Sequence, residues 1–182
     1  MTRLIEIPIE QMTDAQRKLY EKIASGPRGG VRGPFLAWLK SPEYLAKLEE
    51  TGRYLRYDTL FEPRLSEFAI LITARFWDSQ FEWYAHEPLA RKGGLSPEII
   101  KAVRENRRPA EMAADEEAIY DFCTALHENH FVSDEVYQNA FVHFGERGLV
   151  ELIVLIGHSA TVSMTLNAFE LQVPEGQEAP LK

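Results

Sequence analysis

Three polar side chains, Ser79, Glu82 and His86, follow one another at spacings that suit one face of a helix. Residues at i, i+3 and i+7 project from the same side of an α-helix, and Glu82 and His86 are close enough to touch. A carboxylate beside an imidazole favours the imidazolium and orients the ring, as general acid–base catalysis requires. Such pairs are also common on ordinary helix surfaces, so the spacing alone leaves both interpretations open.

Glu67 lies in the helix expected just before this face. A short turn at Asp78 would fold the two helices back on each other, so Glu67 could face the same space. Aromatic walls beside the face would exclude water and shift the pKa values of the carboxylates. The flanking aromatic residues are Trp77, Phe81, Trp83 and Tyr84, of which the two tryptophans are more typical of a core or an interface.

Capping signals predict helices along most of the chain. Thr13 and Gln16 form a capping box for a helix to about Ser25. Ser-Pro pairs open helices at 41–42 and 96–97, and Pro63 opens another that runs to about Trp77. Asp78 is the expected N-cap of a helix over 79–92, which Gly93 and Gly94 end. Further helices are expected over 116–130, 133–145 and 149–169.

The last of these segments opens with strand-forming residues, but it continues without a turn residue other than Gly157, which favours a buried helix. With strand signals scarce elsewhere, we predict an all-α fold. The length of 182 residues and the 45% hydrophobic content suit a single domain over 1–182. We divide it into a helix-and-loop extension (1–40), a core (41–172) and a tail (173–182). The Gly- and Pro-rich stretch 26–34 lacks the spacing of a nucleotide-binding fingerprint and is expected to be a mobile loop.

Composition excludes several classes of partner. The net charge of −8 opposes binding to nucleic acid or to an anionic membrane surface, because both need clustered Lys and Arg. The apolar stretch 149–173 contains Glu151 and His158, so it is expected to be a buried helix and not a membrane span. The N-terminal residues show no apolar signal region, so a cytoplasmic protein is the expectation.

Cys123 is the single cysteine, which excludes an internal disulfide and a multi-Cys zinc site. Cys123 and His127 are four residues apart and could form a nucleophile–base pair, although a lone Cys on an apolar helix is more often a core residue. His127 and His130 make a weak metal site without a third ligand and are better explained as histidines at a helix C-terminus. His158 is expected to be a hydrogen-bonded core histidine that could line the same cavity.

The spacing of Glu67, Ser79, Glu82 and His86 resembles the core motif of the carboxymuconolactone decarboxylase and alkylhydroperoxidase D superfamily. In its peroxidase branch the motif is Glu, Cys-x-x-Cys and His, and here Ser79 and Glu82 stand at the two Cys positions. The segment Phe-Glu-Trp-Tyr-Ala-His is similar to the decarboxylase branch, where Glu-Trp-x-x-His is usual. The resemblance covers most of the chain, and the similar segments are 33–42, 81–86, 90–96, 151–153 and 166–169.

The resemblance implies an all-α helical bundle whose core helix hairpin carries the site, assembled as a trimer or hexamer. A thiol peroxidase needs a thiolate and, in this branch, a resolving cysteine, which Ser79 and Glu82 cannot supply. We therefore expect a cofactor-independent, metal-free acid–base lyase, acting like a decarboxylase on a small lactone or carboxylic acid from aromatic catabolism. The alternatives are a peroxidase-type antioxidant protein and a non-catalytic oligomer that binds a small hydrophobic acid.

In this hypothesis His86 donates the proton and Glu82 orients it. Glu67 holds the ring or acts as a second acid, and Ser79 binds a substrate oxygen. A substrate carboxylate would need an arginine, for which the sequence neighbours Arg64 and Arg75 are candidates.

Overall fold

The computed structural model describes residues 2–27 and 29–182. Within that part every regular element is helical, as predicted. The elements in chain order are η1 (Ile9–Gln11), α1 (Asp14–Ser25), α2 (Pro34–Trp38), α3 (Pro42–Tyr57), α4 (Pro63–Phe76), α5 (Gln80–Gly93), α6 (Pro97–Arg104), α7 (Ala114–Thr124), η2 (Ala125–Asn129) and α8 (Asp134–Ala168).

Most helix starts lie where the capping residues predicted them. Thr13 and Gln16 form the complete capping box of α1. The hydroxyls of Ser96 and Ser133 accept hydrogen bonds from backbone N–H groups at the starts of α6 and α8. The capping residues did not indicate η1 or the short helix α2, which begins with Pro34.

The turn between α4 and α5 differs from the prediction by one residue. Asp78 adopts a left-handed conformation (φ 48°), and its N–H donates to Arg75 O while Ser79 N–H donates to Ala74 O. This is the Schellman arrangement, so Asp78 ends α4 and does not cap α5. Ser79 takes the N-cap position of α5 instead.

Two expected helices are joined in α8, and one expected helix is divided. Gly145 has non-helical torsions (φ 65°, ψ −179°), so α8 is kinked at the glycine where the sequence predicted a helix end. The segment expected to be helical over 116–130 continues from α7 into the π-helical turn η2, which ends at the left-handed His130 (φ 58°).

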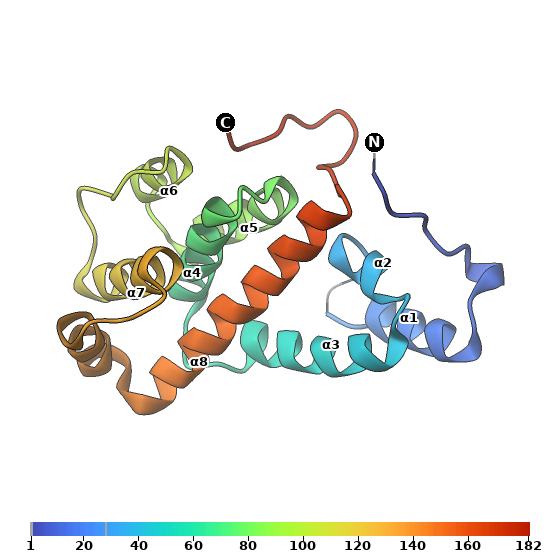
Figure 1. Cartoon of the computed structure of the whole chain (residues 1–182), viewed down its shortest axis with the longest axis horizontal. Helices are drawn as coiled ribbons and strands as arrows, with labels where there is room; N and C mark the ends of the chain where they lie inside the picture. The colour runs from blue at the N-terminus through green and yellow to red at the C-terminus, as the bar shows by residue number, and fades with distance from the viewer. Residues whose placement is uncertain (1, 28) are drawn as a thin grey trace.

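Helix α4 lies at the centre of the bundle and packs against α5, α6, α7 and α8. Every residue of α4 from 65 to 74 is buried. One hydrophobic cluster joins α4–α7 with the middle of α8, and a second joins α1–α3 with Val162 and Leu166 near the end of α8. Helix α8 runs diagonally past both clusters (Figure 1), so it connects the N-terminal helices to the rest of the bundle.

By length and composition alone, α8 could cross a membrane, with a mean hydropathy of 1.7 over its most apolar window. Half of that window is buried inside the fold. The core helix of a soluble protein can have the same length and composition.

Candidate active site

The hairpin of α4 and α5 brings Glu67 and His86 together across 19 residues of sequence. His86 Nδ1 lies 2.5 Å from Glu67 Oε2, and His86 Nε2 lies 3.5 Å from Glu82 Oε1. Both carboxylates are almost completely buried. The imidazole is therefore held between two acidic side chains, with one ring nitrogen directed at each.

The two carboxylates differ in how closely they contact the imidazole. The short contact from Nδ1 fixes the ring through Glu67, so Glu67 orients His86. Glu82 faces the other nitrogen at a longer distance and also lines a cavity. Holding the ring is one of the two roles expected for Glu67. Glu82, which was expected to orient the ring, contacts it at the longer distance of 3.5 Å.

The two carboxylates also control the charge of His86. Burial lowers the pKa of His86, but the charges of Glu82 and Glu67 and the hydrogen bond that Glu67 accepts outweigh burial, so the pKa lies above 6.5. Arg56 opposes this rise. His86 therefore tends towards the imidazolium, with an N–H on each ring nitrogen.

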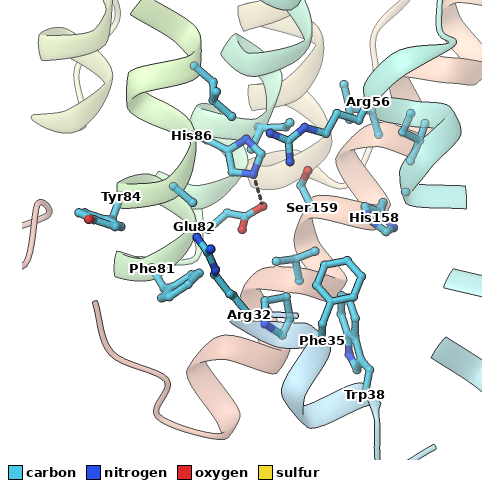
Figure 2. A pocket seen from close by; sticks show the side chains of 18 of the residues that line it. Arg32, Phe35, Trp38, Arg56, Phe81, Glu82, Tyr84, His86, His158 and Ser159 are labelled. Atoms are coloured by element: carbon cyan, nitrogen blue, oxygen red, sulfur yellow. Dashed lines mark ion pairs between the residues drawn. The ribbon is translucent and has the colours of Figure 1, made fainter. Parts of the chain in front are cut away.

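Glu82 and His86 form one wall of a cavity of about 410 Å³ (Figure 2). This volume falls within the usual range of small-molecule sites. The other walls come from the loop before α2 and from α2, α3, α8 and the C-terminal tail. The aromatic lining residues are Phe35, Trp38, Phe81 and Tyr84.

Of the four aromatic residues that flank the predicted face, two line the cavity, and the two tryptophans, expected in a core or an interface, do not. Phe81 and Tyr84 line the cavity, whereas Trp83 is completely buried in the core. Trp77 also lies outside the cavity lining; it packs edge-on against Phe76. Trp38 was not predicted. Its indole N–H donates to Thr165 Oγ1 at 3.0 Å, which fixes the ring as an apolar surface.

The loop expected to be mobile contributes directly to the cavity. Gly30, Arg32 and Pro34 line it. Gly33 has a φ of 56°, and a Cβ there would lie 2.6 Å from the Phe81 ring. Only glycine fits this position, which holds the loop against α5.

Ser79 does not belong to the site. It is fully buried at the N-cap of α5, outside the cavity lining, and its hydroxyl has no hydrogen-bond partner among the described residues. The predicted face assumed that Ser79 lies inside the helix, whereas helical torsions begin at Gln80. Ser159 of α8 lines the cavity instead, and so does the neighbouring His158.

Neither arginine proposed from the sequence reaches the cavity. Arg64 pairs with Glu62, Asp115 and Glu116, and Arg75 pairs with Asp78. The cavity is lined by Arg32 and Arg56 instead. No motif marked these two residues, because they approach the hairpin only through the packing of the N-terminal helices.

Cys123 and His127 lie away from this cavity. Cys123 is completely buried, and burial raises the pKa of its thiol far above the usual range. Burial lowers the pKa of His127 to about 4, and its Nε2 lies 3.0 Å from Thr73 Oγ1. No hydrogen bond joins Cys123 to His127 in the described part of the chain, and no three metal-ligating side chains gather there. The exposed His130 terminates η2.

No protein-family profile and no curated protein matches the chain. Chains of several solved structures do, including the following two. The alkylhydroperoxidase AhpD core of an uncharacterized peroxidase-related protein from Ralstonia eutropha JMP134 superimposes with a TM-score of 0.79 at 15% identity, over 96% of this chain and 93% of the other. A protein of unknown function from Agrobacterium tumefaciens, a putative antioxidant defence protein AhpD, superimposes with a TM-score of 0.68 at 20% identity, over 79% of this chain and 99% of the other. The chain therefore has the helical fold of the alkylhydroperoxidase AhpD core, as the motif around Glu67 and His86 predicted.

Proposed function

We propose that the protein is an acid–base lyase that decarboxylates a small lactone or carboxylic acid without a cofactor. The observation that carries this proposal is the row Glu67–His86–Glu82, which ends at the wall of a largely apolar cavity. A histidine charged by two carboxylates and facing a small-molecule cavity is suited to deliver a proton.

The proposed reaction uses only groups of this chain. The bond between the substrate carboxylate and its α-carbon breaks, CO2 departs, and the electron pair moves into a conjugated carbonyl to form an enolate. His86 then donates its Nε2 proton to the carbon, while Glu67 keeps Nδ1–H and the ring in place. Glu82 lies beside Nε2 and returns a proton from water to the imidazole.

A direct test follows absorbance and CO2 release with γ-carboxymuconolactone and related lactone acids. We expect His86→Gln to lower kcat by about 10²-fold or more, the usual effect of losing a general acid. His130→Gln, at an exposed histidine outside the cavity, is the matched control. Equal turnover by wild type and His86→Gln would exclude His86 as the proton donor.

A thiol peroxidase is the second candidate, favoured by the fold neighbours and opposed by the position of Cys123. That thiol is buried, its pKa is raised, and it lies outside the cavity. The test is peroxide consumption before and after Cys123→Ser. Activity that survives the substitution excludes Cys123 as an essential thiol, whereas its loss would favour the peroxidase.

The third candidate is a protein that binds a small hydrophobic acid in the same cavity without reaction. Thermal-shift measurements against a panel of aromatic catabolites, combined with turnover assays, separate it from the lyase. Binding without any turnover across the panel would favour this candidate.

A further inference from the structure

Most arginines of the protein already have an acidic partner. The described part of the chain contains twelve arginines, and nine of them pair with a carboxylate. These nine are Arg3, Arg53, Arg64, Arg75, Arg91, Arg104, Arg107, Arg108 and Arg147. Arg17, Arg32 and Arg56 have no ion pair with any described residue. Two of these three line the candidate active-site cavity.

The two arginines that line the cavity approach the hairpin of α4 and α5 from different elements. Arg32 lies in the loop before α2, and Arg56 lies in the last turn of α3. In Figure 2 the Arg56 side chain extends towards His86, and Arg32 reaches towards Glu82 from the opposite wall. Both guanidinium groups therefore border the space in front of the two proposed proton-transfer residues.

The backbone around each arginine is held in place. Glu151 of α8 accepts a hydrogen bond from the Tyr54 hydroxyl at 2.7 Å and one from Leu60 N–H at 2.8 Å, which ties the end of α3 to α8. On the other side, Gly33 packs against Phe81 directly after Arg32. The packing thus directs two cations without acidic partners towards one cavity.

An anionic ligand could bind in this cavity only if positive side chains offset the negative charge of its acidic residues. Glu67 and Glu82 carry two negative charges and the His86 imidazolium one positive charge, so these three residues alone would repel a carboxylate. Arg32 and Arg56 add two positive charges, which makes the net charge of these five side chains positive. A guanidinium also presents N–H groups in the planar geometry that matches a carboxylate. In the same cavity, Phe35 and Trp38 meet edge to face at 5.4 Å and form an apolar wall.

We infer that Arg32 and Arg56 form a carboxylate-binding subsite, and that the ligand is a small anion whose flat apolar body lies against Phe35 and Trp38. This inference rests on the proposed function in taking the same cavity as the site, and it extends that proposal by naming the group that holds the substrate. The carboxylate is anchored beside His86 and Glu82, within their reach.

Calorimetric titration with unreactive probes tests the inference independently of catalysis. The probes are benzoate, cinnamate and 2-naphthoate, each compared with its neutral amide of nearly the same shape. We expect wild type to bind at least one acid about ten-fold more tightly than its amide. Arg32→Gln and Arg56→Gln should each remove most of that preference, and Arg56→Lys should keep part of it because it retains the charge. Arg17→Gln, at the third arginine without an acidic partner, should bind as wild type does.

In the titrations, the inference would be overturned by equal affinity of wild type for each acid and its amide, by an equal loss in Arg17→Gln, or by no saturation with any of the three acids at their solubility limits. Circular dichroism and the Tm of each variant confirm that it is folded. Because no probe can be decarboxylated by the proposed route, binding with the expected arginine dependence stands even if no lactone is turned over. Turnover that is unaffected by either arginine substitution would retain the lyase and reject this subsite.

Discussion

At the scale of single residues, His86 and His127 have opposite electrostatic surroundings. His86 lies between Glu67 and Glu82, whose charges outweigh burial and raise its pKa. His127 stacks on Phe76 at 4.5 Å between ring centroids, and burial lowers its pKa to about 4. Opposite pH dependences of stability follow from these two environments.

For His86, the folded-state pKa lies above the unfolded value of about 6.5. Its contribution to stability is therefore fully present below about pH 6.5 and is lost as the pH rises through the folded-state pKa. Glu67→Gln should lower the pKa of His86 and weaken this dependence, as measured by NMR titration and urea unfolding from about pH 5 to about pH 9. Glu50→Gln, at an exposed position of α3, is the control. An unchanged His86 titration in Glu67→Gln would show that Glu67 does not charge the ring.

For His127, the folded-state pKa lies below the unfolded value, so the unfolded chain takes up the proton first as the pH falls. We expect the free energy of unfolding to decrease between about pH 6.5 and about pH 4, by about 1–3 kcal/mol after allowance for solvent screening. His127→Gln should remove this part of the acid sensitivity. His143→Gln, at an exposed position of α8, should retain it. The same acid slope in His127→Gln would assign the effect to another group.

At the scale of elements, the loop before α2 is shaped by glycines in different surroundings. Gly29 and Gly33 both have positive φ angles, of 66° and 56°. A Cβ at Gly33 would collide with Phe81, whereas a Cβ at Gly29 has nothing within 4 Å. Comparing the two positions separates backbone strain from collision with the cavity wall.

Gly33→Ala should therefore destabilise the protein by more than the roughly 1–3 kcal/mol of backbone strain and should also weaken ligand binding, because Phe81 must move into the cavity. Gly29→Ala should show the strain alone and leave binding unchanged. Urea unfolding and titration with 2-naphthoate measure the two effects. Equal losses in the two variants would mean that contact with Phe81 is unimportant.

The C-terminal tail is a second element whose role depends on a few contacts. Leu181 is buried, and its backbone exchanges two hydrogen bonds with the Gln80 side chain, at 2.9 and 3.0 Å. Pro174, earlier in the tail, lines the cavity. A chain ending at Ala179 should lose about 2 kcal/mol of stability from the burial of one leucine. Lys182→Ala should be neutral, and an unchanged Tm of the shortened chain would show that the tail does not stabilise the fold.

At the scale of the whole molecule, α8 has an apolar face that no element of the described residues covers. Val150, Ile153, Val154 and Met164 are 43–61% exposed and recur at helical spacing. The superfamily resemblance predicts a trimer or hexamer, and we expect this face to be covered by another copy of the chain. The acidic composition remains the argument against a membrane as the covering surface.

Light scattering should therefore give a mass three or six times the 20.9 kDa of one chain. Ile153→Glu should lower that mass, because it buries a charge in the expected interface. Val142→Glu, on the other side of the kink at Gly145, is the control. A monomeric wild type, or its co-sedimentation with neutral lipid vesicles, would contradict the expected homo-oligomer.

Local sequence signals predicted much of this fold correctly. Thr13, Ser96 and Ser133 marked helix starts because a side chain that caps a helix acts within three residues of its own position. Gly145 marked the kink in α8 for a similarly local reason. The motif spacing also indicated that Glu67 and His86 face the same space, since a hairpin of two regular helices has few possible registers.

Long-range packing decided the remaining features of the site. Ser79 and Asp78 were misassigned because the end of α4, and not the preference of either residue, determines which of them enters the left-handed conformation. Arg64 and Arg75 are near the motif in sequence but pair elsewhere, whereas Arg32 and Arg56 reach the cavity from separate elements. The sequence by itself determined most of the helices and the grouping of Glu67, His86 and Glu82, because those depend on contacts within one turn or one hairpin. Only the tertiary structure decided which cations and aromatic rings surround that row, because they converge through contacts between helices that are distant in the chain.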